Sequence, residues 1–172
     1  MIINEIIKLL NNIIYFLNSK EIKNQKKFEH YQKINSIVKD FYYLIPVIWS
    51  NKENKYKIDT QCIEKTSKNC KLLKKIQINL SILSNEAKYL FDTEIEKFEK
   101  DFYLICYKCK FLLDENETAN YSDSIEDDLN SIIEKIRIRE ELYEKFLKSD
   151  ALKFKEFIKN TKNDIIFYDK YK

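Results

Sequence analysis

Glycine is absent from this 172-residue chain, and proline occurs only once, at Pro46. Glycine adopts the positive φ angles of tight turns most easily, so β-hairpins and glycine-capped helix ends should be scarce. Helices joined by asparagine, aspartate and serine loops are the simplest alternative. Because 44% of the residues are apolar, the chain can build one core without a metal or disulfide. We therefore predict an all-α fold with a single helical domain over residues 1–172.

The lack of glycine and the single histidine also exclude several kinds of catalytic site. No Walker A loop, dinucleotide-binding turn, nucleophile elbow or standard EF-hand loop can be built without glycine. Di-iron bundles need two Glu-x-x-His motifs, and His30 is the only histidine. Its neighbours form no recognisable catalytic context, so we predict a surface or boundary position on a helix. The sequence predicts no cofactor and no metal.

Long apolar runs are missing as well. No stretch approaches the roughly 18 uninterrupted apolar residues of a membrane span. The start, MIINEIIKLL, lacks the basic region of a signal peptide. We expect a soluble cytoplasmic protein without a membrane partner, in which cysteines stay reduced. The abundance of Ile, Lys, Asn, Tyr and Phe is typical of an AT-rich genome.

Helices in the first third of the chain are predicted from apolar residues that share one face at about 100° per residue. A first helix is expected over residues 2–18 and a second over residues 21–45. The second should end before Pro46, which has no amide hydrogen to donate. Residues 50–58 are predicted to form a loop.

Two further helices are expected in the middle of the chain. The first runs from Thr60 to Phe91, because its apolar positions stay in phase throughout. Asp92 is a candidate N-cap for the second, which should reach about Leu113. A flexible acidic loop is possible over residues 114–123. The predicted inward residues of the second helix are Ile95, Phe98, Phe102, Ile105, Cys106, Cys109 and Leu113.

The last segment keeps its apolar phase from Ile125 to Phe157. Over residues 124–160 it could form one helix, or two helices with a break near Ser149 and Asp150. Residues 164–172 are predicted to be an aromatic tail. Helices of these lengths indicate an elongated bundle of about five long amphipathic helices, packed as antiparallel hairpins or in a coiled-coil-like manner.

Two constellations could hold a metal, and both are weighed against simpler interpretations. Cys106 and Cys109 have zinc-ligand spacing, but they lie on an apolar face, so we predict core thiols. Cys62 is predicted to lie on the apolar face of its helix in the same way. Paired acids one helical turn apart hold magnesium in all-helical nucleoside triphosphate pyrophosphohydrolases, and this remains an unfavoured alternative. The acids concerned are Glu96, Glu99, Asp123 and Glu126.

The distribution of charge suggests nucleic acid as an alternative partner. Residues 1–80 carry 15 lysines against 7 acids, whereas residues 81–130 carry 5 against 13. Lysine stripes can follow a phosphate backbone. Arginine, which makes bidentate phosphate contacts, occurs only at Arg137 and Arg139. The candidate lysines are Lys23, Lys26, Lys27, Lys68, Lys71 and Lys75.

Protein recognition is favoured by the aromatic content. Every residue from 41 to 49 is apolar or aromatic except Pro46, and a helix buries only part of its circumference. Core packing under the following loop is the simpler interpretation, but aromatic residues dominate interface hot spots. The predicted partner-binding residues are Tyr43, Val47 and Trp49. We predict a non-enzymatic protein-binding module (an adaptor, complex subunit or inhibitor, with a mobile-element origin as one context), and RNA or DNA backbone binding as the alternative. Oligomeric state is left open.

Overall fold

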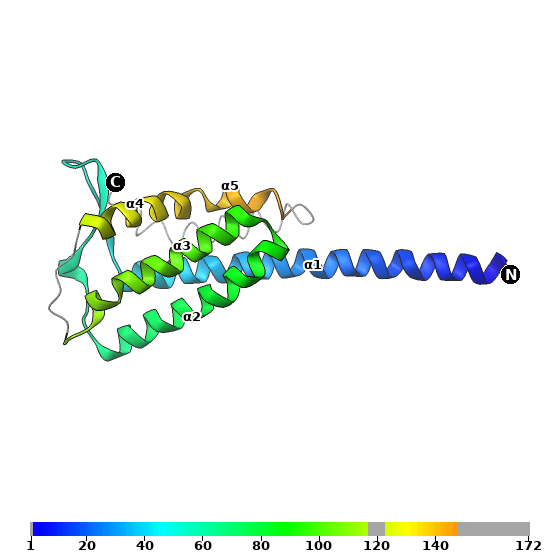
Figure 1. Ribbon diagram of the computed structural model, residues 1–172, viewed down its shortest axis with the longest axis horizontal. Coiled ribbons are helices and arrows are strands. Elements are labelled where there is room, and N and C mark those ends of the chain that lie inside the picture. Colours follow the sequence, from blue (N-terminus) through cyan, green and yellow to red (C-terminus); the bar gives the residue numbers. More distant parts are fainter. Residues whose placement is uncertain (1, 117–122, 148–172) are drawn as a thin grey trace.

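The computed structural model describes residues 2–116 and 123–147, without the side chains of residues 16–21, 123 and 124. Its helices lie side by side along one direction, and the first extends far beyond the others (Figure 1). The predicted all-α elongated bundle is confirmed. In order, the elements are α1 (Ile2–Leu44), β1 (Val47–Ser50), β2 (Lys55–Ile58), the short 3-10 helix η1 (Thr60–Cys62), α2 (Ser67–Leu90), α3 (Thr93–Cys109), η2 (Lys110–Leu113), α4 (Asp123–Arg137) and α5 (Arg139–Glu144).

The N-terminal helix α1 is one continuous helix of 43 residues. The sequence-based division into helices at 2–18 and 21–45 was therefore wrong. No glycine or proline stands between them, and asparagine or serine in a helix costs only a few tenths of a kcal/mol. The helix ends at Leu44, directly before Ile45 and Pro46, as predicted.

Residues 47–58 form a β-hairpin, which corrects the loop predicted for residues 50–58. Strands β1 and β2 pair antiparallel, with Val47 opposite Ile58 and Ser50 opposite Lys55. Asn54 takes the positive φ of 52° that the turn requires. Asparagine tolerates this left-handed conformation better than most residues, so a hairpin is possible here without glycine.

The hairpin is held against α4 by the amide side chain of Asn130. Its Oδ1 accepts from the backbone N of Tyr56 at 2.6 Å, and its Nδ2 donates to the Tyr56 carbonyl at 2.8 Å. Lys55 Nζ lies 2.6 Å from Glu126 Oε2, also on α4. The small sheet therefore extends the helical core instead of standing apart from it.

Helices α2 and α3 form an antiparallel hairpin with a capped start at each helix. Thr66 accepts from the backbone N of Asn69 at 3.1 Å, so α2 begins at Ser67 and not at the predicted Thr60. Asp92 accepts from the backbone N of Ile95 at 2.9 Å and caps α3, as predicted. All the predicted inward residues of α3 and η2 are buried.

The last described helical segment breaks earlier than expected. Helix α4 ends at Arg137, and Ile138 (φ −94°, ψ 9°) separates it from α5. The break predicted near Ser149 and Asp150 lies outside the described residues, as do residues 117–122 of the acidic loop and the aromatic tail.

One continuous core runs through the bundle. It joins α1 from Tyr31 onward to the hairpin and to helices α2–α5. Phe41 packs edge-on against Phe102 with ring centroids 5.1 Å apart, and Tyr31 packs against Tyr143 at 5.0 Å. Among the described side chains of α1, those that take part in this core all lie in the second half of the helix.

Candidate interaction surface

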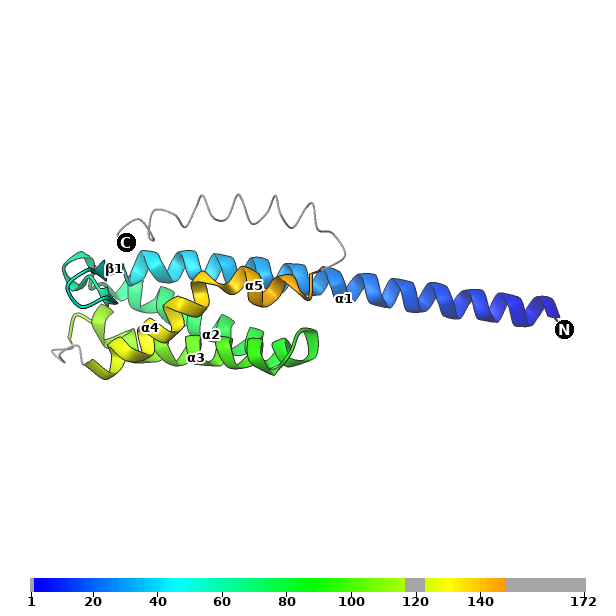
Figure 2. The same ribbon diagram turned by 90° about the horizontal axis from the view of Figure 1, so that it is seen from above.

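The first half of α1 projects from the bundle as a free arm, which we define as residues 2–22. Figures 1 and 2 show in two perpendicular views that the described part of no other helix runs beside it. Its described apolar side chains are between 46% and 77% exposed. They are Ile2, Ile3, Ile6, Ile7, Leu9, Leu10, Ile13, Ile14, Tyr15 and Ile22. Large exposed apolar patches on a protein mark interaction sites, because their hydration is unfavourable.

Two apolar stripes run along the arm. About 18 residues make five turns of an α-helix, so residues 18 or 36 apart lie on one line along it. The first stripe is Ile2, Ile6, Leu9 and Ile13, in line with Val38, Tyr42, Ile45 and Tyr31, which are all buried. The second stripe is Ile3, Ile7, Leu10 and Ile14, in line with the exposed side of the helix at Lys39 and Tyr43. The first stripe thus extends the face that packs inside the bundle, but nothing described covers it.

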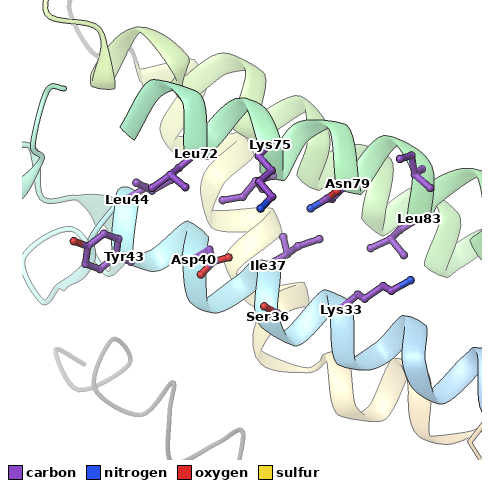
Figure 3. Close-up of a pocket in the computed structure, with 12 residues that line it drawn as sticks. Lys33, Ser36, Ile37, Asp40, Tyr43, Leu44, Leu72, Lys75, Asn79 and Leu83 are labelled. Carbon is purple, nitrogen blue, oxygen red and sulfur yellow. The ribbon is translucent and has the colours of Figure 1, made fainter. Parts of the chain in front are cut away.

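A groove between α1 and α2 is the second exposed apolar feature (Figure 3). It has a volume of about 460 Å³, and its floor includes Ile37, Leu44 and Leu83. Tyr43 stands at one end of it and is 63% exposed. Of the three predicted partner-binding residues, Tyr43 alone has a largely exposed side chain.

Val47 and Trp49 lie in the hairpin. Val47 is buried in the core. Trp49 is half-buried and packs edge-on against Tyr56, with ring centroids 4.8 Å apart. The aromatic side chains of residues 41–49 are thus covered by the helical core at Phe41 and Tyr42 and partly by β2 at Trp49. The structure does not bring Val47 and Trp49 together with Tyr43 on one exposed surface, and a role for Tyr43 in binding stays a prediction.

The sequence analysis predicts a surface or boundary position for His30, and the structure corrects this. The side chain is 1% exposed and lies within a polar cluster. Its Nε2 lies 2.5 Å from Oε1 of Glu99, whose side chain is fully buried. The same carboxylate oxygen accepts from the hydroxyl of Tyr143 at 2.6 Å. The other ring nitrogen, Nδ1, points to the more exposed Glu86 at 3.6 Å. Three helices, α1, α3 and α5, therefore meet at one buried carboxylate.

A buried arginine extends this polar layer. Arg139 Nε donates to Oδ1 of Asn35 at 2.6 Å, and one terminal nitrogen donates to the Ile136 carbonyl at 2.6 Å. Burial raises the pKa of Tyr143 well above 10, and the Glu99 carboxylate raises it further. Burial also raises the pKa of Tyr31 to about 12. Most polar atoms of the cluster are hydrogen-bonded, and among its described side chains His30 Nδ1, Asn35 Nδ2 and Glu99 Oε2 are buried without a hydrogen-bond partner. The many buried hydrogen bonds between helices are typical of a structural network.

The candidate lysines fall into two separate groups. Lys68, Lys71 and Lys75 are exposed near the start of α2. Lys23 and Lys26 are exposed on α1, and Lys26 lies beside Glu86 and Tyr89 near the end of α2. Half-buried Lys27 has its pKa lowered by burial and by Lys23. The structure therefore places the two groups at opposite ends of α2 and forms no single basic stripe from them.

Three of the four acids considered for magnesium have other partners. Glu99 belongs to the buried cluster, Glu96 pairs with Lys100 at 2.5 Å, and Glu126 pairs with Lys55. The side chain of Asp123 lies outside the described set. Within residues 2–116 and 123–147, no three histidine, cysteine or acidic side chains are placed to hold a metal ion.

The four thiols differ in their exposure. Cys106 and Cys109 are buried, as predicted, and burial raises the pKa of Cys106 well above 9 and that of Cys109 to about 12. Cys70 is half-buried and donates to the Leu113 carbonyl at 3.0 Å. Cys62 is exposed in η1, which corrects its predicted place on an apolar helix face.

Thiol labelling of the folded protein should follow this order. We expect Cys62 to react first, and Cys106 and Cys109 to react only as fast as the protein unfolds, because buried neutral thiols are poor nucleophiles. Peptide mass spectrometry after timed alkylation measures each site, and Cys62→Ser is the matched control. A chelator should leave the melting temperature unchanged. Rapid labelling of Cys106 under native conditions would contradict the assigned core position.

Among the described helices, none combines the length and the apolarity that crossing a membrane requires. Comparison of the chain with protein-family models, with curated proteins and with solved structures found no match.

Proposed function

We propose that this chain is a non-enzymatic helical module that binds protein through its N-terminal arm. The observation that supports this most strongly is the row of exposed isoleucine and leucine side chains along residues 2–14. Full burial of one such side chain stabilises by about 1.5–3 kcal/mol, so several together provide the driving force of a specific interface. The bundle then acts as the scaffold from which the arm is presented.

The seven-residue spacing of the arm indicates that the partner is helical. Each stripe advances by four and then three residues, which is the spacing of helices that pack along one another. In the bundle, α1 uses this kind of face against α2, α3 and α5, as the contacts of Ile37, Phe41 and Tyr31 show. An amphipathic helix laid into a helical groove is a common mode of recognition.

The test is a pair of aspartate substitutions in the arm, Ile6→Asp with Leu10→Asp. Both side chains are about half exposed, so the bundle should keep its stability while partner capture is lost. The matched control is Ile78→Asp with Ile82→Asp on α2, which has the same spacing and similar exposure. Affinity capture from the native source, quantified by mass spectrometry beside a thermal melt, gives the readout. Capture of the same proteins in the same amounts by the arm variant would contradict the proposal.

A further inference from the structure

The two apolar stripes of the arm indicate how many neighbouring helices are needed to cover it. The second stripe is the first shifted by one residue, and one residue corresponds to about 100° around a helix. A single partner helix covers one such stripe, as in a two-stranded coiled coil. A helix with two stripes at this angle fits between two neighbours, as each helix does in a four-helix bundle, where neighbouring contacts lie about 90° apart.

The residue types in the arm also favour an assembly of more than two helices. In the seven-residue pattern, Ile3 and Leu10 occupy position a, and Ile6 and Ile13 occupy position d. Isoleucine at both positions, or leucine at a with isoleucine at d, shifts coiled coils from two strands toward three or four. The remaining apolar residues, Ile2, Ile7, Leu9 and Ile14, occupy the flanking positions g and e that such assemblies also bury.

The polar face of the arm is compatible with a copy of itself. Over residues 2–15 it carries one acid, Glu5, and one base, Lys8, among uncharged residues that include Asn4 and Asn11. The end of the arm adds one charge of each sign, at Lys20 and Glu21. Copies that meet in a symmetric interface bring identical charges together, so a strongly basic or acidic arm would repel itself. A helix that lies on an anionic membrane instead needs several lysines or arginines on its polar face. Over residues 2–15 the arm has only Lys8 there.

The available area is also sufficient. A stable interface buries roughly 800 Å² on each partner. Eight isoleucine and leucine side chains that are each about half exposed or more provide an apolar surface of that order. The contact between arms is expected to end after Leu17. From there to the buried part of α1, the a and d positions are occupied by the polar residues Lys20, Asn24 and Lys27.

We infer that further copies of this chain cover the arm, and that four arms pack into a bundle at the centre of a homotetramer. This inference rests on the proposed function, since it names the partner of the same surface. The four compact bundles are then carried outward, away from the central four-helix contact. The α1–α2 groove stays on the surface of each copy.

The experiment is light scattering on the purified full chain, at high concentration and after dilution. The wild type is expected to have about four times the monomer mass, and the Ile6→Asp, Leu10→Asp variant the mass of a monomer with an unchanged helical spectrum. The Ile78→Asp, Ile82→Asp control should assemble like the wild type. A wild-type dimer or trimer that the arm substitutions convert to a monomer would still support the inference that copies of the chain cover the arm. It would correct only the number of chains in the assembly.

A monomeric wild type at every concentration would overturn the inference. Sedimentation with phosphatidylserine vesicles then tests whether the arm binds a lipid surface. Binding to the vesicles through the arm would also overturn the inference. An oligomer that persists in the arm variant would place the contact elsewhere and overturn it too. A monomeric wild type that captures another protein through the arm leaves the proposed function standing, whereas unchanged capture by the arm variant removes the function itself.

Discussion

Replacing Glu99 with alanine is expected to lower the free energy of unfolding by about 2–6 kcal/mol, because the His30 ring and the Tyr143 hydroxyl each lose a buried hydrogen-bond partner, at about 1–3 kcal/mol apiece. The carboxylate is fully buried between His30 and Tyr143, at 2.5 Å and 2.6 Å. Without it, the imidazole and the phenol hydroxyl lose their shared partner in a place that water does not reach. Denaturant unfolding followed by circular dichroism measures the loss.

Glu96→Ala is the matched control for this substitution. Glu96 lies three residues earlier on α3 and pairs with the exposed Lys100, four residues on. Such surface pairs contribute about 0.3–0.5 kcal/mol. A Glu99→Ala variant as stable as the Glu96→Ala variant would show that the buried cluster contributes nothing to the fold.

Raising the pH is expected to destabilise the protein steeply from about pH 9 upward. Burial raises the pKa of Cys106 and Cys109 above the usual 9, and those of Tyr31 and Tyr143 above the usual 10. In the unfolded chain these groups lose their protons at their ordinary pKa, whereas in the folded protein they keep them. Their stabilising contribution is therefore complete below about pH 9 and is lost as the pH rises through the raised folded values.

The size of this effect distinguishes it from general alkaline damage. Each group contributes a slope of about 1.4 kcal/mol per pH unit between its unfolded and folded pKa values. Unfolding by denaturant at a series of pH values measures the slope. A Cys106→Ala, Cys109→Ala variant should lose stability less steeply above about pH 9, because the two buried thiols no longer contribute, whereas Cys62, Cys70 and the two tyrosines, whose pKa values are also raised, remain. A flat profile across this range would contradict the assigned burial of all four groups.

The parts of the fold that could be predicted from the sequence depend on local signals. Pro46 ends α1 because proline lacks an amide hydrogen, and Asp92 caps α3 because its side chain accepts from a free backbone amide. The buried face of α3 follows from its helical period alone. These features hold whatever the rest of the chain does, so a single sequence is enough to predict them.

The hairpin and the His30 cluster depend on distant residues and were missed. The strands at residues 47–58 are held by Asn130, more than 70 residues later, which no local pattern could indicate. The turn uses Asn54 in place of the expected glycine. His30 is buried because Glu99 and Tyr143 approach it from two other helices. A lone histidine with no nearby motif gives no sign of such partners.

The arm was predicted correctly as a helix and incorrectly as part of the bundle. Apolar periodicity shows which face of a helix is to be covered, but not whether the same chain covers it. One signal was present in the sequence. Lys20, Asn24 and Lys27 interrupt the apolar positions of α1 for about two turns, and the described core begins after them. The sequence instead favours Tyr43, Val47 and Trp49 as binding residues, because apolar and aromatic residues are denser around them.

The central claim, that the arm belongs to an interface and not to the bundle, is tested most directly by removing residues 2–17, which carry every exposed apolar side chain described in the arm except Ile22. A chain in which Met1 is joined to Asn18 should melt at the same temperature as the full-length Ile6→Asp, Leu10→Asp variant, since neither can use the arm for assembly and the core begins after it. Circular dichroism melts of the two proteins give the comparison. A truncated chain that melts far below the aspartate variant, or does not fold, would show that residues 2–17 are part of the core and would contradict the account.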